Sequence, residues 1–199
     1  MISHTIQYAM ASKSVDRVFV STDDDVISRI SRGDGAEVIP RPTEIAGDTA
    51  TTESAISHAI EWWRGQNLTP EIIVLLQATS PLRPHGSLDK ALEKFRTGGF
   101  DSLLSISPTH RFFWKVSGEE AHAEYDFMNR PRRQDMVESD IRYVENGSVY
   151  IFSTGHFERA GNRLGGKIGY TIFPEAFSPE IDISSDFTLL EEIAKNLKS

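Results

Sequence analysis

The sequence contains no cysteine among its 199 residues. This absence excludes disulfide bonds, thiolate catalysis and cysteine-type zinc sites together. No apolar run approaches the roughly 18 residues that a membrane-spanning helix needs. The first residues, Met1-Ile2-Ser3-His4, lack the basic flank and the long apolar stretch of a signal peptide. From these absences we expect a cytoplasmic protein without a membrane segment.

Positively charged residues are fewer than negatively charged ones. The chain has 21 Lys and Arg against 29 Asp and Glu, which gives a formal net charge of −8. A general nucleic-acid binder is therefore not expected, because phosphate backbones favour clustered Lys and Arg. Nucleotide binding is not excluded, since it needs only a few local cations and usually a divalent metal. With 39% apolar and 25% charged residues, the composition is typical of a folded domain of ordinary size.

Helical and strand patterns alternate along the first half of the chain. The clearest helix is predicted at 55–63, where apolar residues fall at i, i+1, i+4, i+5 and i+8. The clearest strand is 72–76, which is apolar throughout and therefore typical of a strand buried on both faces of a parallel sheet. Further strands are predicted at 15–22, 36–39 and 102–106. Further helices are predicted from the start of the chain to about Ser12, after the acidic cluster 23–25, and at 87–95. The second of these helices has Val26, Ile27 and Ile30 on its apolar side. This alternation predicts an α/β fold whose parallel sheet is covered by helices on both faces.

The second half of the chain has a different pattern. Strand-like segments at 112–116, 141–144, 148–152 and 167–173 are separated by turns and polar loops. We expect a small antiparallel extension or lid beside the parallel sheet, over approximately 111–166, and a last helix at 186–197. Because there is no repeat and no long linker, the chain is predicted to form a single domain over 1–199.

The most specific stretch is Leu75-Leu76-Gln77-Ala78-Thr79-Ser80-Pro81-Leu82-Arg83. Here a buried strand runs into polar residues at the point where its carboxyl end should emerge. In open α/β sheets the ligand crevice lies at that end of the strands. An ordinary strand followed by a Ser-Pro turn explains the segment equally well, so both interpretations stay open on these residues alone.

The same stretch resembles the L-Q-[PA]-T-S-P-L-R signature of the acylneuraminate cytidylyltransferases, which join CTP to sialic acid or a related nonulosonic acid. Matching segments follow the family's order along essentially the whole chain: 18–24, 41–42, 48–53, 131–135, 145–150 and 180–187. The related Kdo cytidylyltransferases carry an acidic residue in a V-Q-G-D-E-P pattern, whereas this chain has Ala78-Thr79-Ser80. The resemblance is therefore to the sialate-type branch. It implies a Rossmann-like fold of the nucleotide-diphospho-sugar transferase type.

The resemblance implies that Glu180 and Asp182 bind Mg²⁺, with Asp182 as a catalytic residue. Their spacing suits this role, because alternate residues of an extended segment share a face. Mg²⁺ is commonly held by few carboxylates together with water and phosphate. The alternative is that Asp182 or Asp186 only caps the last helix. Glu180 stands where the family more often has Asp, so coordination through water stays open.

For the sugar acid, the resemblance implies a catalytic role for Arg132, whose guanidinium can grip a carboxylate at two points. The other implied sugar contacts are Gln77, Lys115, Asn146 and Tyr150. Arg132 and Arg133 can also be interpreted as an exposed basic face. For the nucleotide, the resemblance places Arg41 and Thr52 against the cytidine, although Thr52 could equally begin the helix at 55–63.

One segment of the family is absent from this sequence. Members of the family begin with a short strand and a loop of the form A-R-x-G-S-K, whose backbone amides and basic side chains hold the triphosphate. A G-K-P-L-I element follows this loop. Here Met1-Ile2 aligns with the end of that element. Three explanations are open: a start assigned too late, a genuine truncation, or a strand supplied by another chain. We favour the first, because the sugar and metal residues keep their chemistry, and we expect little turnover from these residues alone.

The predicted reaction is transfer of CMP from CTP to a nonulosonic acid, which gives the CMP-sugar and pyrophosphate. Mg²⁺ is the expected cofactor. A homodimer is the expected assembly, because related enzymes are commonly dimers in which the antiparallel extension reaches across. The alternatives are a non-catalytic domain that binds nucleotide sugars and a nucleotidyltransferase that acts on a different sugar. N-acetylneuraminate, legionaminate and their relatives all stay candidate acids.

Overall fold

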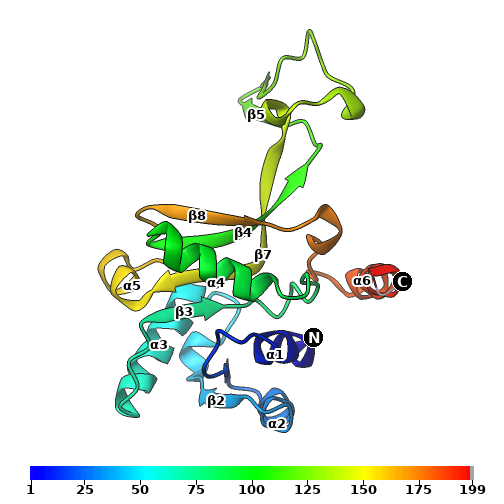
Figure 1. Ribbon diagram of the computed structural model, residues 1–199. Helices are drawn as coiled ribbons and strands as arrows, with labels where there is room; N and C mark the ends of the chain where they lie inside the picture. Colours follow the sequence, from blue (N-terminus) through cyan, green and yellow to red (C-terminus); the bar gives the residue numbers. More distant parts are fainter. Residues whose placement is uncertain (198–199) are drawn as a thin grey trace.

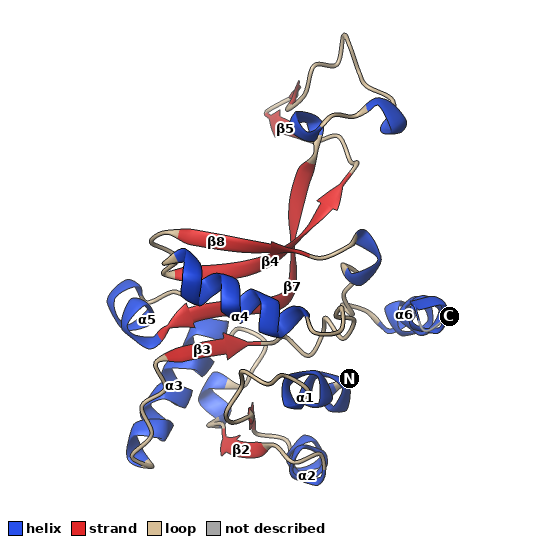
Figure 2. Cartoon of the chain, in the orientation of Figure 1, coloured by secondary structure: helices blue, strands red, loops and turns tan. Residues whose placement is uncertain are grey.

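The computed structural model describes residues 1–197. Figure 1 shows a layered body from which one narrow segment projects, and Figure 2 separates its helices from its strands. The strands are β1 (Phe19–Thr22), β2 (Glu37–Pro40), β3 (Ile72–Leu75), β4 (Ser102–Thr109), β5 (Trp114–Ser117), β6 (Glu120–Ala123), β7 (Arg142–Ser153) and β8 (Ile168–Ile172). The α-helices are α1 (Ile2–Met10), α2 (Asp25–Gly33), α3 (Thr52–Gly65), α4 (Ser87–Gly98), α5 (Thr154–Ala160) and α6 (Ser184–Leu197).

The main sheet has the strand order β3-β7-β4-β8. Strand β7 runs antiparallel to β3 and β4, and β4 runs parallel to β8, so β3, β4 and β8 share one direction. Strands β1 and β2 form a separate parallel pair. The predicted α/β fold with a mostly parallel sheet is therefore confirmed. Within the described residues, β1 pairs only with β2 and β3 only with β7, so each has one edge without a strand partner.

Helices cover both faces of the main sheet, as the alternation predicts. Consecutive residues of β7 point to opposite sides. Ile151 packs with α4 residues such as Phe95, whereas Phe152 packs with Ile60 of α3 and Phe157 of α5. Both β7 residues are 0% exposed. Burying a side chain of this size stabilises a fold by about 2–3 kcal/mol, so β7 is fixed from both sides of the sheet.

We call residues 110–141 the arm, because Figure 1 shows this segment projecting from the body beyond β4 and β7. At its base, Thr109 of β4 pairs with Arg142 of β7. Within it, β5 and β6 form a small antiparallel hairpin. An ion pair of 3.4 Å between Arg133 and Glu175 also links the arm to the body. The large apolar side chains Phe113, Trp114, Val116, Phe127, Met128 and Val137 of the arm stay exposed.

The strand predicted at 15–22 is shorter in the structure, where β1 begins only at Phe19. Before it, the backbone amides of Lys13 and Ser14 donate to the Asp89 carboxylate at 3.4 and 3.1 Å. Ser12 Oγ donates to the same carboxylate at 2.6 Å. These bonds direct residues 12–14 toward α4, and pairing with β2 starts only at Val18, whose carbonyl accepts a 2.9 Å hydrogen bond from the Glu37 amide.

The strands predicted at 141–144 and 148–152 form the single strand β7, so their separation was wrong. Leu104 pairs with Tyr150 and Ile106 with Glu145, which leaves residues 146–149 opposite Ser105 in a bulge. The sequence resembles a turn here because the bulge contains Gly147, which has the left-handed φ of 61° that turns commonly use.

The predicted start of α2 is confirmed, because the Asp24 side chain accepts a 2.7 Å hydrogen bond from the amide of Ile27. Its predicted apolar side is wrong. Val26, Ile27 and Ile30 are 53%, 38% and 41% exposed, and Ser31 is buried instead. The helix therefore packs through small side chains. No helix within residues 1–197 is both long enough and apolar enough to cross a membrane.

Candidate functional site

Three polar side chains converge on Gly147 in the bulge of β7. This residue has a φ of 61°, and a Cβ atom built on it would lie 2.5 Å from Oε1 of Gln77, 2.7 Å from Oε1 of Glu180 and 2.8 Å from Oγ of Ser80. Glycine is the residue that accepts both this conformation and this close approach. The structure thus brings the predicted sugar contact Gln77 and the predicted metal ligand Glu180 together just beyond the carboxyl end of β3.

Ser80 is the most deeply buried member of this convergence, with 1% of its surface exposed. Its Oγ has no hydrogen-bond partner among the described residues. Buried hydroxyl groups are normally hydrogen-bonded, because leaving one unpaired costs free energy. This hydroxyl is therefore a group that a bound molecule or an ordered water would satisfy.

Arg83 connects the segments that carry Gln77 and Gly147. Its guanidinium donates to the carbonyl oxygen of Gln77 at 2.7 Å, to that of Ser148 at 3.0 Å and to Thr5 Oγ1 at 3.2 Å. Burial lowers the pKa of Arg83 to about 10, and the nearby Tyr8 partly opposes this shift. A buried cation bound by carbonyl oxygens holds the end of β3 against the bulge.

Glu180 and Asp182 lie on the segment between β8 and α6. The amide of Ile181 donates a 2.8 Å hydrogen bond to the carbonyl of Thr79, which holds this segment against the loop after β3. Burial raises the pKa of Glu180, and the negative charges of Asp182 and Glu145 raise it further. Negative charge concentrated in this way favours a bound cation. Within residues 1–197, no three His, Cys, Asp or Glu side chains are grouped as a metal site by themselves.

Asp186 has the capping role that the sequence allowed for it. Its Oδ2 accepts hydrogen bonds of 2.9 Å from the amides of both Asp182 and Ile183 at the start of α6. These bonds lower the pKa of Asp186. The Asp182 side chain is exposed and is not the group that caps this helix.

Asn146 holds the bulge from inside the protein and is 1% exposed. Its Oδ1 accepts from Ser105 Oγ at 2.5 Å and from the Ser148 amide at 3.3 Å. Its Nδ2 donates to Ser107 Oγ at 2.9 Å. The protein itself engages this amide, so in the observed conformation Asn146 positions Gly147.

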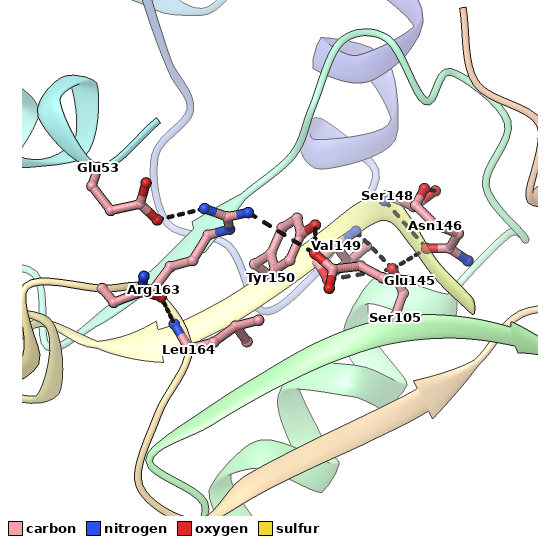
Figure 3. A network of polar contacts seen from close by, with 10 residues as sticks. Glu53, Ser105, Glu145, Asn146, Ser148, Val149, Tyr150, Arg163 and Leu164 are labelled. Atoms are coloured by element: carbon pink, nitrogen blue, oxygen red, sulfur yellow. Dashed lines mark hydrogen bonds and ion pairs between the residues drawn. The ribbon is translucent and has the colours of Figure 1, made fainter. Parts of the chain in front are cut away.

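Tyr150 and Glu145 belong to a second polar network, which Figure 3 shows. The Tyr150 hydroxyl donates to Glu145 Oε1, and the Arg163 guanidinium lies 4.5 Å from the centre of the Tyr150 ring. Arg163 also forms ion pairs of 2.5 Å with Glu53 and 3.9 Å with Glu145. Burial, with the hydrogen bond to Glu145, raises the pKa of Tyr150 to about 12, so the phenol stays protonated.

The two predicted nucleotide contacts lie on other elements. Arg41 follows β2 and donates to Ser21 Oγ at 3.0 Å and to the Ser21 carbonyl at 2.6 Å. Thr52 is the first residue of α3, whose N-cap Thr51 accepts a 3.1 Å hydrogen bond from the Ser54 amide. The prediction that Thr52 begins this helix is confirmed. Contact of Arg41 and Thr52 with cytidine stays a prediction.

Lys115 and Arg132 lie on the arm, away from the end of β3 (Figure 1). Their side chains are 80% and 75% exposed and pair with arm carboxylates, Lys115 with Glu124 at 2.9 Å and Arg132 with Asp135 at 2.5 Å. Arg132 borders an open cavity of about 790 Å³ that is lined by His110, Arg111, Phe112, Trp114, Tyr125, Arg130, Pro131, Arg132 and Arg133. Within one chain, these cations do not join Gln77 and Glu180.

Sequence reasoning assigned no role to Arg83, Glu53 or Arg163. A signal for Arg83 existed, because it ends the stretch 75–83. No local pattern marks the ion pair of Glu53 and Arg163, whose partners are 110 positions apart. Only the folded chain brings them together.

A family model described as cytidylyltransferase matches residues 1–152, which is most of the chain. The chain belongs to the cytidylyltransferase family. The resemblance inferred from the stretch 75–83 is therefore confirmed. This cytidylyltransferase is 35% identical to N-acylneuraminate cytidylyltransferase of Oncorhynchus mykiss, over 96% of its own length and 44% of that protein. It spans less than half the length of that relative.

Two further relatives are bacterial. The cytidylyltransferase is 24% identical to N-acylneuraminate cytidylyltransferase of Escherichia coli O18:K1:H7, over 95% of its own chain and 44% of that protein. It is 27% identical to post-translational flagellin modification protein B of Campylobacter coli, over 98% of its own chain and 84% of that protein.

Solved structures agree on the fold. CMP:2-keto-3-deoxy-manno-octonic acid synthetase complexed with CTP superposes with a TM-score of 0.65 at 14% identity, over 99% of this chain and 87% of that one. A 4-diphosphocytidyl-2C-methyl-D-erythritol synthase from Anaerococcus prevotii gives 0.66 at 11% identity, over 98% and 88%. At these identities the likeness concerns the fold alone.

Proposed function

We propose that this cytidylyltransferase transfers CMP from CTP to a nonulosonic acid, such as a sialic or legionaminic acid, giving the CMP-sugar and pyrophosphate. The observation that carries the proposal is the convergence of Gln77, Ser80 and Glu180 on Gly147. It lies just beyond the carboxyl end of β3, where α/β sheets bind their ligands. Relatives named N-acylneuraminate cytidylyltransferase support the choice of acid.

In the proposed reaction, the hydroxyl oxygen at C2 of the acid attacks the α-phosphorus of CTP. The bond from this phosphorus to the bridging oxygen breaks, pyrophosphate leaves with the electron pair, and the hydroxyl proton passes to solvent. Gln77 would orient the acid, and Arg132 would bind its carboxylate through two parallel hydrogen bonds. Arg41 and Thr52 would contact the cytidine. No side chain stands out as a general base, and Asp182 is the proposed catalytic carboxylate.

The proposed cofactor is Mg²⁺, held by Glu180 and Asp182. The raised pKa of Glu180 supports this fit, because burial and the neighbouring Asp182 and Glu145 already disfavour its negative charge. A cation would relieve that repulsion. Two carboxylates suit Mg²⁺, which keeps several waters and takes further oxygens from phosphate. When bound, the ion supplies neutralising charge to the phosphates.

The proposed assembly is a homodimer in which the arm of one copy reaches the site of the other. Lys115 and Arg132 are exposed on the arm, whereas Gln77 and Glu180 lie in the body. The carboxylates around Glu180 are complementary in charge to these cations. A partner would also cover apolar arm residues such as Trp114, which is 49% exposed.

The test is calorimetric titration of the wild type and of Arg132→Ala with CTP and with N-acetylneuraminate. We expect Arg132→Ala to weaken binding of the acid at least about tenfold, because a two-point charged contact is lost. Binding of CTP should change by less than about twofold. Equal losses for both ligands would contradict the assignment of Arg132.

Pyrophosphate release is measured in parallel with CTP, Mg²⁺ and a panel of nonulosonic acids. Release that needs both CTP and the acid supports the transfer reaction. Little turnover is expected from these residues alone, so binding of an acid without release supports the alternative of a non-catalytic domain only where CTP does not bind. Failure of every acid in the panel to bind would overturn the proposed substrate class.

A further inference from the structure

Arg163 lies in the loop between α5 and β8, outside the segments that carry the family resemblance. We propose that Arg163 is a positioning residue. It holds two acceptor-side residues, Tyr150 and Glu145, against Glu53 in the first turn of α3. Glu53 lies on the nucleotide side of the site. This inference rests on the proposed function, because it assigns these two sides to the two substrates.

The loop that carries Arg163 is anchored to β4. Ser102 Oγ accepts a 3.0 Å hydrogen bond from the Gly165 amide and donates one of 2.8 Å to the Gly165 carbonyl. Ser102 itself is 0% exposed. The side chain of Asn162 closes the loop by accepting a 2.8 Å bond from the Leu164 amide. The backbone on both sides of Arg163 is therefore fixed, and the guanidinium is directed toward β7 (Figure 3).

The contacts of Arg163 join its own loop to two elements, α3 and β7. Its Nη1 pairs with Glu53 of α3 at 2.5 Å, its Nη2 lies 3.9 Å from Glu145 of β7, and its guanidinium stacks 4.5 Å from the ring centre of Tyr150. The side chains of Arg163 and Glu53 are only 19% and 24% exposed. Ion pairs shielded from water in this way interact more strongly than exposed ones.

Removing this cation would affect the acceptor side through its neighbours. Glu145 accepts the hydrogen bond of Tyr150, which the sequence predicts as a contact of the sugar acid. Without Arg163, the carboxylates of Glu53 and Glu145 would lose their shared counter-ion. Glu145 would then be free to move away from Tyr150, whose phenol would lose its fixed orientation.

Arginine suits this position better than lysine. A planar guanidinium can stack on an aromatic ring while its separate nitrogens meet two carboxylates. An ammonium group would keep the charge but could not make the stacked contact with Tyr150 and reach both Glu53 and Glu145. Arg163→Lys should therefore restore part of what Arg163→Met loses.

The experiment measures binding of N-acetylneuraminate and of CTP by calorimetry, together with the melting temperature. We expect Arg163→Met to weaken binding of the acid about tenfold and Arg163→Lys about threefold, with CTP affinity changed less than about twofold. The matched control is Arg64→Met, which breaks an exposed ion pair with Glu158 between α3 and α5. It should leave both affinities unchanged.

A second variant separates positioning from simple stability. Glu53→Gln removes the partner on α3 and should also weaken the acid about threefold, although Glu53 lies on the nucleotide side. The double variant with Arg163→Met should be no weaker than Arg163→Met alone, because both changes break one linkage. A purely structural role would lower the melting temperature and leave the affinity of the folded protein for the acid unchanged.

The outcomes distinguish the inference from the function on which it rests. If the wild type binds the acid and Arg163→Met binds it equally well, the inference is overturned and the proposed function stands. If the wild type binds no nonulosonic acid, the proposed function fails, and the inference fails with it. Should Arg163→Met not fold, unchanged acid affinity in both Arg163→Lys and Glu53→Gln would overturn the inference.

Discussion

The guanidinium of Arg83 donates a 2.7 Å hydrogen bond to the main-chain carbonyl of Gln77. The same side chain donates to the carbonyl of Ser148, next to Gly147, at 3.0 Å. One buried cation therefore sets the distance between the loop that carries Gln77 and the bulge on which the candidate site converges.

Arg83→Met should destabilise the fold by about 3 kcal/mol, because the carbonyls of Gln77 and Ser148 and the Thr5 hydroxyl lose the guanidinium as a donor. Urea denaturation followed by circular dichroism measures this loss. The stability of Arg83→Lys should lie between that of the wild type and that of Arg83→Met, since an ammonium group reaches fewer acceptors. The control is Arg17→Met, which breaks an exposed ion pair with Glu37 and a cation–π contact with Phe19 and should have little effect. Equal stability of Arg83→Met and the wild type would contradict the role of this residue.

Gly147→Ala should cost stability and also weaken binding of the acid. The added Cβ would meet the side-chain ends of Gln77, Ser80 and Glu180 at 2.5–2.8 Å. Gln77 and Glu180 are flexible and can move aside, so displacing the buried Ser80 hydroxyl adds about 1 kcal/mol to the backbone strain. The control is Gly118→Ala in the β5–β6 turn. Its φ is also 61°, but nothing lies within 4 Å of the added Cβ, so only the left-handed strain of about 1 kcal/mol remains. Equal losses of stability in the two variants would show that the close approach does not matter.

How much of this site is readable from the sequence depends on whether the signal is local. The stretch 75–83 and the pair Glu180 and Asp182 are short patterns, and the structure places Gln77 and Ser80 of the first and Glu180 of the second around Gly147. The bulge of β7 was not predicted, because an Asn-Gly pair between apolar runs is also a common turn. The ion pair of Glu53 and Arg163 could not be predicted from the sequence, since the two residues meet only through tertiary packing.

The same distinction applies to the fold. Helix α3 was predicted from its apolar periodicity, and strand β3 from its continuous apolar run. The insertion of β7 between β3 and β4 was not predicted, because strand order depends on contacts far apart in the chain. The exposure of Val26 shows that an apolar stripe alone does not decide which side of a helix is buried.

Asp186→Asn should make stability less dependent on acid pH. The hydrogen bonds from the Asp182 and Ile183 amides lower the folded-state pKa of Asp186 below the ordinary value of 3.8. Its stabilising effect is therefore present above that pH and is lost as the pH falls through the folded pKa. The urea midpoint of Asp186→Asn should lie below that of the wild type near neutral pH, and the gap should close in acid. A gap that stays constant across the titration would argue against this account.

Mixing two defective variants tests the proposed reach of the arm. Arg132→Ala and Gln77→Ala homodimers should each bind N-acetylneuraminate weakly. In a mixed dimer, one site combines an intact Gln77 with an intact Arg132 from the other copy. Co-refolding equal amounts should therefore restore about a quarter of the wild-type binding capacity, since half of the dimers are mixed and each has one intact site.

Calorimetry gives that capacity, and sedimentation velocity confirms that mixed dimers form. A sample that recovers no capacity would contradict a site shared between copies. Mixing either variant with itself provides the baseline.

Lys115 and Arg132, the cations proposed to select the acid, lie on the arm. They are therefore separate from the packing that holds the sheet together. The arm joins the body through β4 and β7 and through an exposed ion pair between Arg133 and Glu175. Substitutions around Arg132 and Lys115 therefore leave the clusters beneath α3 and α4 untouched. If the arm selects the acid as proposed, exchange of this segment should change the preferred acid with little penalty in folding of the body.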